Sequence, residues 1–469
     1  MKSKSTIRAL AELILQNVDA LEEALEKRGA SVPSLDDPFT PGSDIANGQP
    51  ELMATTELTV RAASQLIQTI RMPQYSVIHE ALSHTNSSTL RVVTELNISE
   101  ILKEAGPDGL HISEIAKKCN ADPVRLCPII RYLCGRWIFR EVTPDVFTNN
   151  RLSSVLDKGK SVAELQKSPE SKFDTPQSAI SALVGHLTDE SMKGGSYLYE
   201  VLSEPDSAFK AVPELCATTK SLGSDLSLWD FYELPEQKYR HYRFGVAMEG
   251  VKNMEPAPLP LGAFDWGSLP EDSLVVDVGG GVGTVSTQLA SVFPKLRLVV
   301  QDRPAVIEDG KKRWKGLNSV GQVSFEAHDF FKPNPIKKPA VFLLKHITHD
   351  WADSYVKTIL QQLREAAGPD TKLVVMDRII PFACPIPEEH TVAKIPGLLN
   401  PQLPWPLTVA GPDQLSTKTS VLMTILFNST ERTLQDAVDL YASAGWKIVK
   451  VNQFEAAGSL PSGIVAVPI

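Results

Sequence analysis

The feature that most constrains the fold is a regular alternation of short apolar runs with helix-length segments between Leu274 and Gln453. The apolar runs are rich in β-branched residues and read "LVVDV", "RLVVQD", "VSFEAHD", "VFLLKHI", "KLVVMD" and "KIVKVNQ". Strands of this kind, separated by helices of about ten residues, predict a parallel sheet covered by helices on both faces. We therefore predict a doubly wound α/β domain, whose ligands bind outside the carboxyl ends of the strands.

The N-terminal half predicts helices. Residues 5–28 and 50–71 have apolar residues three to four apart, and a linker rich in Pro, Gly, Ser and Asp separates them. Residues 109–150 read as a helix, a break at Asn120–Pro123, a second helix and a short β-ribbon, which is the succession of a winged helix-turn-helix. The second helix lacks the Asn, Gln and Lys row that would meet base edges. A module that packs against another subunit is therefore favoured over a DNA-binding one.

Four parts are predicted along the chain. They are an N-terminal helix and linker (1–50), a winged-helix dimerisation domain (51–160), a helical connector that contributes to a substrate pocket (161–262) and the α/β domain (263–469). The connector carries Met and aromatic residues, including Met248, which pack as core or wall a pocket for a flat substrate. The Pro-rich stretch "NMEPAPLPLGAFDWGSLPED" precedes the α/β domain.

Composition excludes several classes of protein. The chain has 469 residues, 42% apolar and 22% charged, with a formal net charge of -9, which argues against binding to nucleic acid or an anionic membrane. Neither a signal peptide nor an apolar run long enough to span a membrane is evident. The five cysteines are scattered without metal-ligand spacing. A cytoplasmic location is expected.

Glycines and acidic residues mark the ends of the first three predicted strands. Asp277 precedes Gly279, Gly281 and Gly283 at a strand-to-helix turn, and this spacing differs from the G-x-G-x-x-G of dinucleotide sites. Asp302 ends the second strand, where a carboxylate can bind ribose hydroxyls. Acidic residues at three successive strand ends, the third being Asp329, favour a nucleoside-binding site over three separate helix caps.

These motifs together resemble those of the class I S-adenosylmethionine-dependent O-methyltransferases of the plant caffeate/flavonoid and fungal secondary-metabolite type. The resemblance covers about residues 75–469 and rests on "VVDVGGGVG", "QDRP", "HDFF", "LLKHITHDW", "VVMDRIIP" and "NSTERT", in this order. It implies a Rossmann-like methyltransferase sheet, an N-terminal helical winged-helix dimerisation domain and a homodimer.

The resemblance also implies the cofactor site. Asp277 and the glycines would hold the methionine part of S-adenosylmethionine, and Asp302 the ribose. Asp329 and Phe330 would lie beside the adenine, Lys345 would reach the cofactor from the fourth strand, and Trp351 would lie beside the adenine ring. The product would be S-adenosylhomocysteine.

The same family pattern places a general base at His349, before "DW", with Asp377 and Glu431 as its acidic partners. Relatives more often have Glu than Asp at the position of Asp377. A phenol titrates near pH 10, and an imidazole with a pKa near 6.5 is suited to remove its proton. A partner on the second ring nitrogen must hold the imidazole in one tautomer. His346 is interpreted as packing or exposed.

Further expectations concern the substrate and the reaction. Asn428 and Met248 match positions near the substrate in relatives, and the substrate is expected to be a small aromatic or polyketide-like molecule with a phenolic hydroxyl.

No metal is expected, because an imidazole base replaces the carboxylate cluster of metal-dependent relatives. The alternative is a pericyclase or dehydratase of the same fold that binds the cofactor without consuming its methyl group. A winged-helix regulator that senses a small molecule is a third hypothesis.

Overall fold

The computed structural model describes residues 4–46, 49–256, 258–315, 322–400, 403–409, 415–454 and 460–469. The chain divides into two compact units. We call them the helical unit (Met1–Tyr197, Ser221–Met254, Pro404–Asp413) and the sheet unit (Leu198–Lys220, Glu255–Leu403, Gln414–Ile469). The four-part division with boundaries after residues 50, 160 and 262 stays a prediction.

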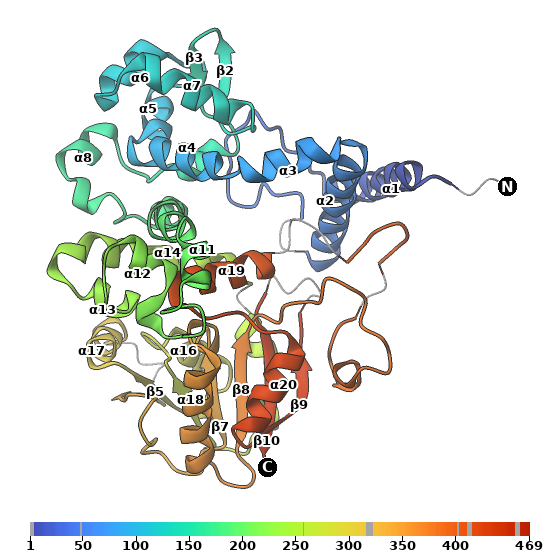
Figure 1. The fold of residues 1–469 in the computed structure, drawn as a ribbon, viewed down its shortest axis with the longest axis vertical. Helices are drawn as coiled ribbons and strands as arrows, with labels where there is room; N and C mark the ends of the chain where they lie inside the picture. The colour runs from blue at the N-terminus through green and yellow to red at the C-terminus, as the bar shows by residue number, and fades with distance from the viewer. Residues whose placement is uncertain are drawn as a thin grey trace. The chain divides into compact units, whose positions relative to one another are not determined.

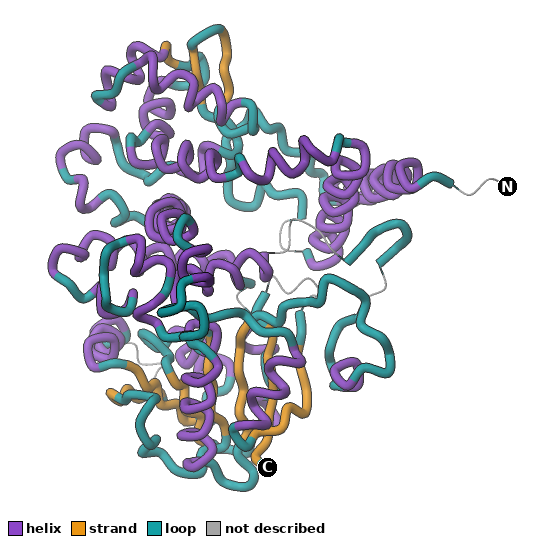
Figure 2. Tube along the Cα trace, viewed as in Figure 1, coloured by secondary structure: helices purple, strands orange, loops and turns teal. Residues whose placement is uncertain are grey.

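Helices make up most of the helical unit (Figures 1 and 2). Ser5 caps the first of them by accepting a hydrogen bond from the backbone N–H of Arg8, and this helix buries Leu10, Leu21 and Leu25. The helices are α1 (Thr6–Lys27), α2 (Pro50–Ile70), α3 (Pro73–Ala81), α4 (His84–Glu95), α5 (Ile98–Ala105), α6 (Ile112–Cys119), α7 (Pro123–Cys134), α8 (Val162–Lys167), α9 (Ala179–His186), α10 (Met192–Gly195), α13 (Leu228–Tyr232) and α14 (Lys238–Met254).

The predicted winged helix is confirmed. Asn120 ends α6 in the left-handed conformation, and the Asp122 carboxylate begins α7 by accepting a hydrogen bond from the N–H of Val124 at 2.9 Å. Strands β1 (Leu110–His111), β3 (Val146–Thr148) and β2 (Arg140–Thr143) pair in that order as a small antiparallel sheet. The apolar sides of α5, α6 and α7 pack over it, with Ile115, Ile130 and Phe147 fully buried.

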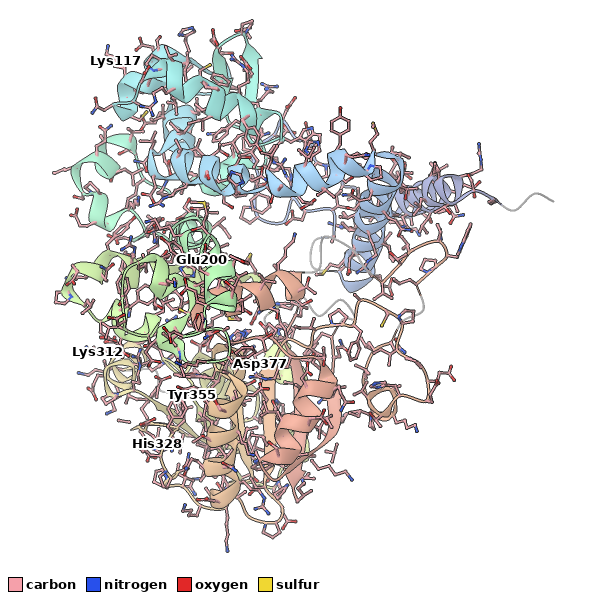
Figure 3. The ribbon with its side chains drawn as sticks, viewed as in Figure 1. Lys117, Glu200, Lys312, His328, Tyr355 and Asp377 are labelled. Atoms are coloured by element: carbon pink, nitrogen blue, oxygen red, sulfur yellow. The ribbon has the colours of Figure 1, made fainter. Side chains whose placement is uncertain are left out.

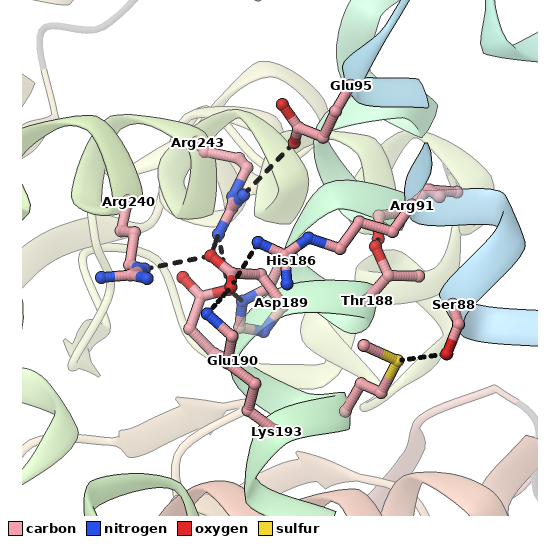
Figure 4. Close-up of polar contacts among 12 residues, drawn as sticks. Ser88, Arg91, Glu95, His186, Thr188, Asp189, Glu190, Lys193, Arg240 and Arg243 are labelled. Carbon is pink, nitrogen blue, oxygen red and sulfur yellow. Dashed lines mark hydrogen bonds and ion pairs between the residues drawn. The ribbon is translucent and has the colours of Figure 1, made fainter. Parts of the chain in front are cut away.

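A buried network of ion pairs joins α4, α14 and the π-helical turn η4 (Leu187–Ser191), as Figure 4 shows. The Arg243 guanidinium donates to Glu190 at 2.6 Å and to Asp189 at 2.8 Å. Asp189 also accepts from Arg240 at 3.0 Å and pairs with Arg91 at 2.9 Å. Buried charges persist only when they are paired, so this network fixes α14 against the neighbouring helices.

A seven-stranded sheet forms the centre of the sheet unit, with its described strands in the order β6-β5-β4-β7-β8-β10-β9. The first five of these pair in parallel, as predicted. The strands are β4 (Leu274–Val278), β5 (Arg297–Asp302), β6 (Val323–Ala327), β7 (Val341–Lys345), β8 (Lys372–Asp377), β9 (Trp446–Asn452) and β10 (Ser462–Pro468). The helices are α11 (Leu198–Ser203), α12 (Ala217–Ser221), α15 (Leu259–Gly262), α16 (Thr284–Val292), α17 (Pro304–Arg313), α18 (Asp353–Ala366), α19 (Leu415–Phe427) and α20 (Leu434–Ser443).

Both faces of this sheet are covered, because successive strand residues point to opposite sides. Phe342 and Leu344 of β7 belong to a core shared with α18 and α20, which lie along the sheet in Figure 1. Val341 and Leu343 of the same strand belong to a second core, which contains residues of α15 and α16. The doubly wound Rossmann-like fold is therefore confirmed.

One strand departs from the sequence prediction. The C-terminal strand β10 is absent from the predicted set, and it pairs antiparallel with both β8 and β9. The chain between Asn452 and Ser462 is too short for the crossover that a parallel neighbour requires, so β10 returns beside β9 as a hairpin partner.

Among the described residues, no helix combines the length and apolar character of a membrane span.

Candidate active site

The glycine turn follows β4 and requires glycine for two reasons. Gly279, Gly281 and Gly283 have φ values of 70°, 60° and 82°, in the left-handed region. A Cβ added to Gly279 would lie 2.4 Å from Cδ1 of Ile347, whereas one added to Gly281 would meet no atom within 4 Å. The turn therefore exposes backbone at Gly281 while packing tightly at Gly279. This combination leaves room for a ligand to lie against the backbone at Gly281.

Two carboxylates support this turn. Asp277 is buried at the end of β4 and accepts a hydrogen bond from the Ser286 hydroxyl at 2.7 Å, and burial raises the pKa of Asp277 to about 6. Asp302, at the end of β5, accepts from the N–H of Gly281 at 2.8 Å and from the N–H of Arg303 at 2.7 Å. The structure thus brings the predicted ribose-binding carboxylate to the glycine turn.

The predicted adenine-side residues gather beyond β6. The rings of Phe330 and Trp351 meet edge to face, with centroids 6.0 Å apart, and a Cβ at Gly279 would lie 3.7 Å from Cε1 of Phe330. Asp329 is exposed and accepts from the N–H of Phe331 at 3.0 Å. An exposed carboxylate and two aromatic rings beside the glycine turn fit an adenine ring and its amine.

Lys345 ends β7 and forms an ion pair with Glu255, its Nζ lying 2.7 Å from Oε2. The other oxygen of Glu255 lies 2.7 Å from Nε2 of His346. Burial would raise the pKa of Glu255, but the hydrogen bond and charge of His346 and the charge of Lys345 hold it at about 2. His346 is therefore bonded rather than merely packed or exposed, which differs from its interpretation in the sequence.

His349 lies in the short 3-10 turn η9 (Thr348–Asp350), and side chains far along the chain hold the backbone of this turn. The Ser429 hydroxyl donates to the carbonyl of His349 at 2.6 Å. The Arg432 guanidinium donates to the carbonyls of Thr348 at 2.6 Å and Trp351 at 2.8 Å. These bonds fix the backbone from which the His349 imidazole projects, so they position the ring.

Carboxylates face both nitrogens of the His349 ring. Nδ1 lies 2.8 Å from Oε1 of Glu431, and Nε2 lies 3.5 Å from Oδ1 of Asp350. Burial alone would lower the pKa of His349, but the charges of Glu431 and Asp350 outweigh it and raise the pKa to about 10. Burial raises the pKa of Asp350 to about 7. The ring can therefore hold a proton firmly and pass it on only when its surroundings change.

Asp377, which Figure 3 labels, ends β8 but does not bond to the His349 ring. Its Oδ2 accepts from the N–H of Thr348 at 3.1 Å and from the Thr348 hydroxyl. Asp377 still raises the proton affinity of His349 through its charge. The side chain of Asp is shorter than that of Glu, which agrees with a carboxylate that bonds to Thr348 and does not reach the His349 ring.

The two predicted substrate residues belong to different units. Met248 is on α14 of the helical unit and is partly exposed. Asn428 follows the last residue of α19 with a φ of 57°, and its side-chain amide donates to the carbonyls of Lys210 at 2.9 Å and Val212 at 3.2 Å. In this structure Asn428 therefore anchors the segment between α11 and α12.

Several site residues escaped the sequence reasoning. Asp350 could have been found, because it directly follows His349 in the sequence and the side chains of adjacent residues can lie close together. Glu255 could not, since 91 residues separate it from His346 and no motif surrounds it. Ser429 and Arg432 lie inside the "NSTERT" motif, but only the fold shows that they bond to the backbone of η9.

Comparisons with known proteins identify the family of the chain. Residues 243–396 match the family model of the O-methyltransferase domain, and residues 78–159 match that of the O-methyltransferase dimerisation domain. The chain is 36% identical to 4-O-methyltransferase 1 of Phanerochaete chrysosporium over 472 residues, which is 99% of either chain. It is also 36% identical to an O-methyltransferase of Armillaria gallica, covering 99% of this chain and 100% of that protein.

Among solved structures, one described as a pericyclic reaction enzyme superimposes with a TM-score of 0.66. It is 16% identical, and the match covers 97% of this chain and all of that one. A structural similarity at this level of sequence identity shows a shared fold and no more.

Proposed function

The chain belongs to the O-methyltransferase family and is an S-adenosylmethionine-dependent O-methyltransferase, and we propose that it methylates a phenolic hydroxyl with His349 as the general base. The acceptor is proposed to be a small aromatic or polyketide-like metabolite. The observation that carries this proposal is the hydrogen bond of 2.8 Å between Nδ1 of His349 and the buried Glu431 carboxylate. It leaves Nε2 as the nitrogen that can take a proton.

When bound, S-adenosylmethionine supplies a methyl group on a positively charged sulfur, which is already activated for attack. The chain must then provide a nucleophilic oxygen, and a phenol is a poor nucleophile until its proton is removed. His349 would take that proton at Nε2, while Glu431 keeps Nδ1 protonated and the ring in one orientation. The proton would move from the acceptor oxygen to Nε2 as the oxygen attacks.

Asp350 bears on this step, because it faces the nitrogen that must accept the proton. With a pKa of about 10, His349 is mostly protonated at neutral pH. The acceptor hydroxyl would take the place of Asp350 beside Nε2, which removes one of the charges that raise the pKa of His349. Arrival of the acceptor would therefore favour loss of the Nε2 proton to solvent, after which the ring can accept the proton of the acceptor.

The cofactor-binding residues are proposed from the same geometry. The glycine turn with Asp277 would hold the methionine part, Asp302 the ribose, and Asp329, Phe330 and Trp351 the adenine. Lys345 would reach the cofactor from β7. Positive φ values at the three glycines and the bond between Gly281 and Asp302 support this assignment. Met248 and Asn428 are proposed to contribute to the acceptor pocket.

The alternative, a pericyclase or dehydratase of the same fold, has a different product. It would leave S-adenosylmethionine intact, whereas methyl transfer releases one S-adenosylhomocysteine for each methylated acceptor. The paired histidine and glutamate favour methyl transfer over a pericyclic rearrangement, because a reaction without proton removal has no need of a buried base. Release of S-adenosylhomocysteine with each turnover distinguishes the two reactions.

Substituting His349 by Ala tests the base. Turnover of a phenolic acceptor should fall by about 10²–10⁴-fold, the usual contribution of a general base. The affinity for S-adenosylhomocysteine, measured by isothermal titration calorimetry, should stay close to that of the unaltered protein. His84→Ala, which removes an exposed histidine of the helical unit, is the matched control. Full turnover by His349→Ala would refute the assignment.

Three further properties stay predictions. Catalysis is expected to need no metal, because the imidazole removes the proton. The partners are expected to be the small-molecule substrate and a second copy of the chain, with neither nucleic acid nor membrane. A cytoplasmic location is also expected.

A further inference from the structure

His346 and His349 form a matched pair of carboxylate-bound imidazoles. Their rings stack with centroids 5.3 Å apart and an angle of 28° between the planes. One nitrogen of each ring is held by a buried carboxylate, Nε2 of His346 by Glu255 and Nδ1 of His349 by Glu431. A carboxylate accepts hydrogen bonds, so the bonded nitrogen carries the proton. In neutral His346 the lone pair is then on Nδ1.

The side chains of His346, His349 and Asp377 converge. One ligand atom each from His346, His349 and Asp377 lies within 4.8 Å of the others. Nδ1 of His346 and Oδ1 of Asp377 are buried and accept no hydrogen bond from the described residues, and Asp377 is only 4% exposed. A buried acceptor without a donor costs about 1–3 kcal/mol. Two such acceptors belong to this three-residue cluster, so a cation or hydrogen-bond donor bound within the cluster would be stabilised.

We propose that His346, His349 and Asp377 form an inhibitory site for a divalent transition-metal cation, with zinc as the probe. Two imidazoles and a carboxylate are a ligand set that zinc accepts at about 2.0–2.2 Å, so small movements of the side chains would close the site. Histidines that bind metals usually donate their other N–H to a carboxylate, as both do here.

Charges of both signs surround the site. Carboxylates of Glu255, Asp350 and Glu431 contact His346 or His349 directly, and Lys345 and Arg378 pair with Glu255 and Glu431. Zinc would displace the proton from Nε2 of His349 and take the lone pair that is proposed to accept the substrate proton. Binding would therefore stop methyl transfer without displacing the cofactor residues. The inhibitory part of this inference rests on the proposed function, whereas the binding part does not.

Zinc binding can be measured by equilibrium dialysis of the full chain after removal of metals. A single zinc ion should bind to the unaltered protein and to His84→Ala, and this binding should be lost in His346→Ala. Glu255→Gln keeps all three ligands and should weaken zinc binding by about 10–100-fold, which is typical for loss of a carboxylate behind a metal-binding histidine. Binding of S-adenosylhomocysteine to each variant checks that the protein is folded.

Two results would overturn the site. One is the absence of zinc binding by the unaltered protein, in which case a water molecule satisfies the two acceptors. The other is equal zinc binding by His346→Ala and the unaltered protein, which would place the ion elsewhere. The methyl-transfer rate should fall in proportion to the fraction of chains with zinc bound. Zinc that binds through His346 but leaves the rate unchanged would support the site and contradict the role of His349 as base.

Discussion

Glu431→Gln separates the charge of the Glu431 carboxylate from its shape. The amide oxygen of glutamine can still accept from Nδ1 of His349, so the ring should stay in place. The charge that contributes most to the raised pKa of His349 is lost. Removing an opposite charge at 2.8 Å should lower the pKa of His349 by about one to three, or about 1.4–4 kcal/mol of proton affinity.

The lower pKa of His349 in Glu431→Gln should alter how the free energy of unfolding depends on pH. The pKa of His349 rises on folding from 6.5 to about 10, so the ion pair stabilises the fold fully below pH 6.5. That contribution is lost as the pH rises through about 10. Glu431→Gln should therefore be less stable than the unaltered protein by about 1.4–4 kcal/mol at pH 6, and most of this difference should disappear by pH 9.5. Urea unfolding at the two pH values measures it.

The pH dependence of kcat/KM should show the same lowering of the His349 pKa. The value of kcat/KM should rise with pH towards about 10 in the unaltered protein, and it should level off at a lower pH in Glu431→Gln. Because both proteins act on the same acceptor, its own ionisation cancels in the comparison. Glu389→Gln is the matched control, since the same substitution there removes an exposed carboxylate of the sheet unit. A stability difference that is constant between pH 6 and 9.5 would refute the reasoning.

Two other predictions concern the cofactor and the assembly. Asp302→Asn should raise the Kd for S-adenosylhomocysteine by about 10–100-fold, the effect of losing a charged hydrogen bond. Calorimetry measures this, and Asp309→Asn on the surface of α17 should leave the Kd unchanged. The chain should form a homodimer, because α3 buries none of its residues and Val77 on this helix is 70% exposed. Light scattering should give twice the chain mass of 51.3 kDa, and the mass of one chain would contradict the prediction.

The sheet could be predicted because the central parallel strands β4, β7 and β8 are buried at all but one position and are therefore mostly apolar. β4, β5 and β8 have the same bounds as the apolar runs in the sequence, since polar residues begin where the strands reach the sheet edge. β10 was missed because "SGIVAVPI" follows β9 after a short connection, and the alternation of strands with helices gives no signal there. Its antiparallel direction depends on the length of the preceding connection.

The site was less predictable than the fold, because its decisive contacts join segments far apart in the chain. The acidic residues at the ends of β4 and β5 could be assigned by position, since parallel strands end at one edge. The bonding of Asp377 could not, because Thr348 and His349 are neighbours and the sequence does not say which one a carboxylate meets. The pKa of His349 also required the structure, since Asp350 and Glu431 approach opposite sides of one ring.

The arrangement around His349 has opposing consequences for a base. The carboxylate of Glu431 bonds to Nδ1 and so fixes the tautomer, but its negative charge also stabilises the proton that the proposed base would have to release after each turnover. Asp350 adds to this proton affinity from the other side. A base held in this way can act at neutral pH only if binding of the other reactants lowers its pKa, either by adding positive charge nearby or by displacing Asp350. Orientation of the base and control of its proton are therefore coupled, and both depend on the charge that Glu431→Gln removes.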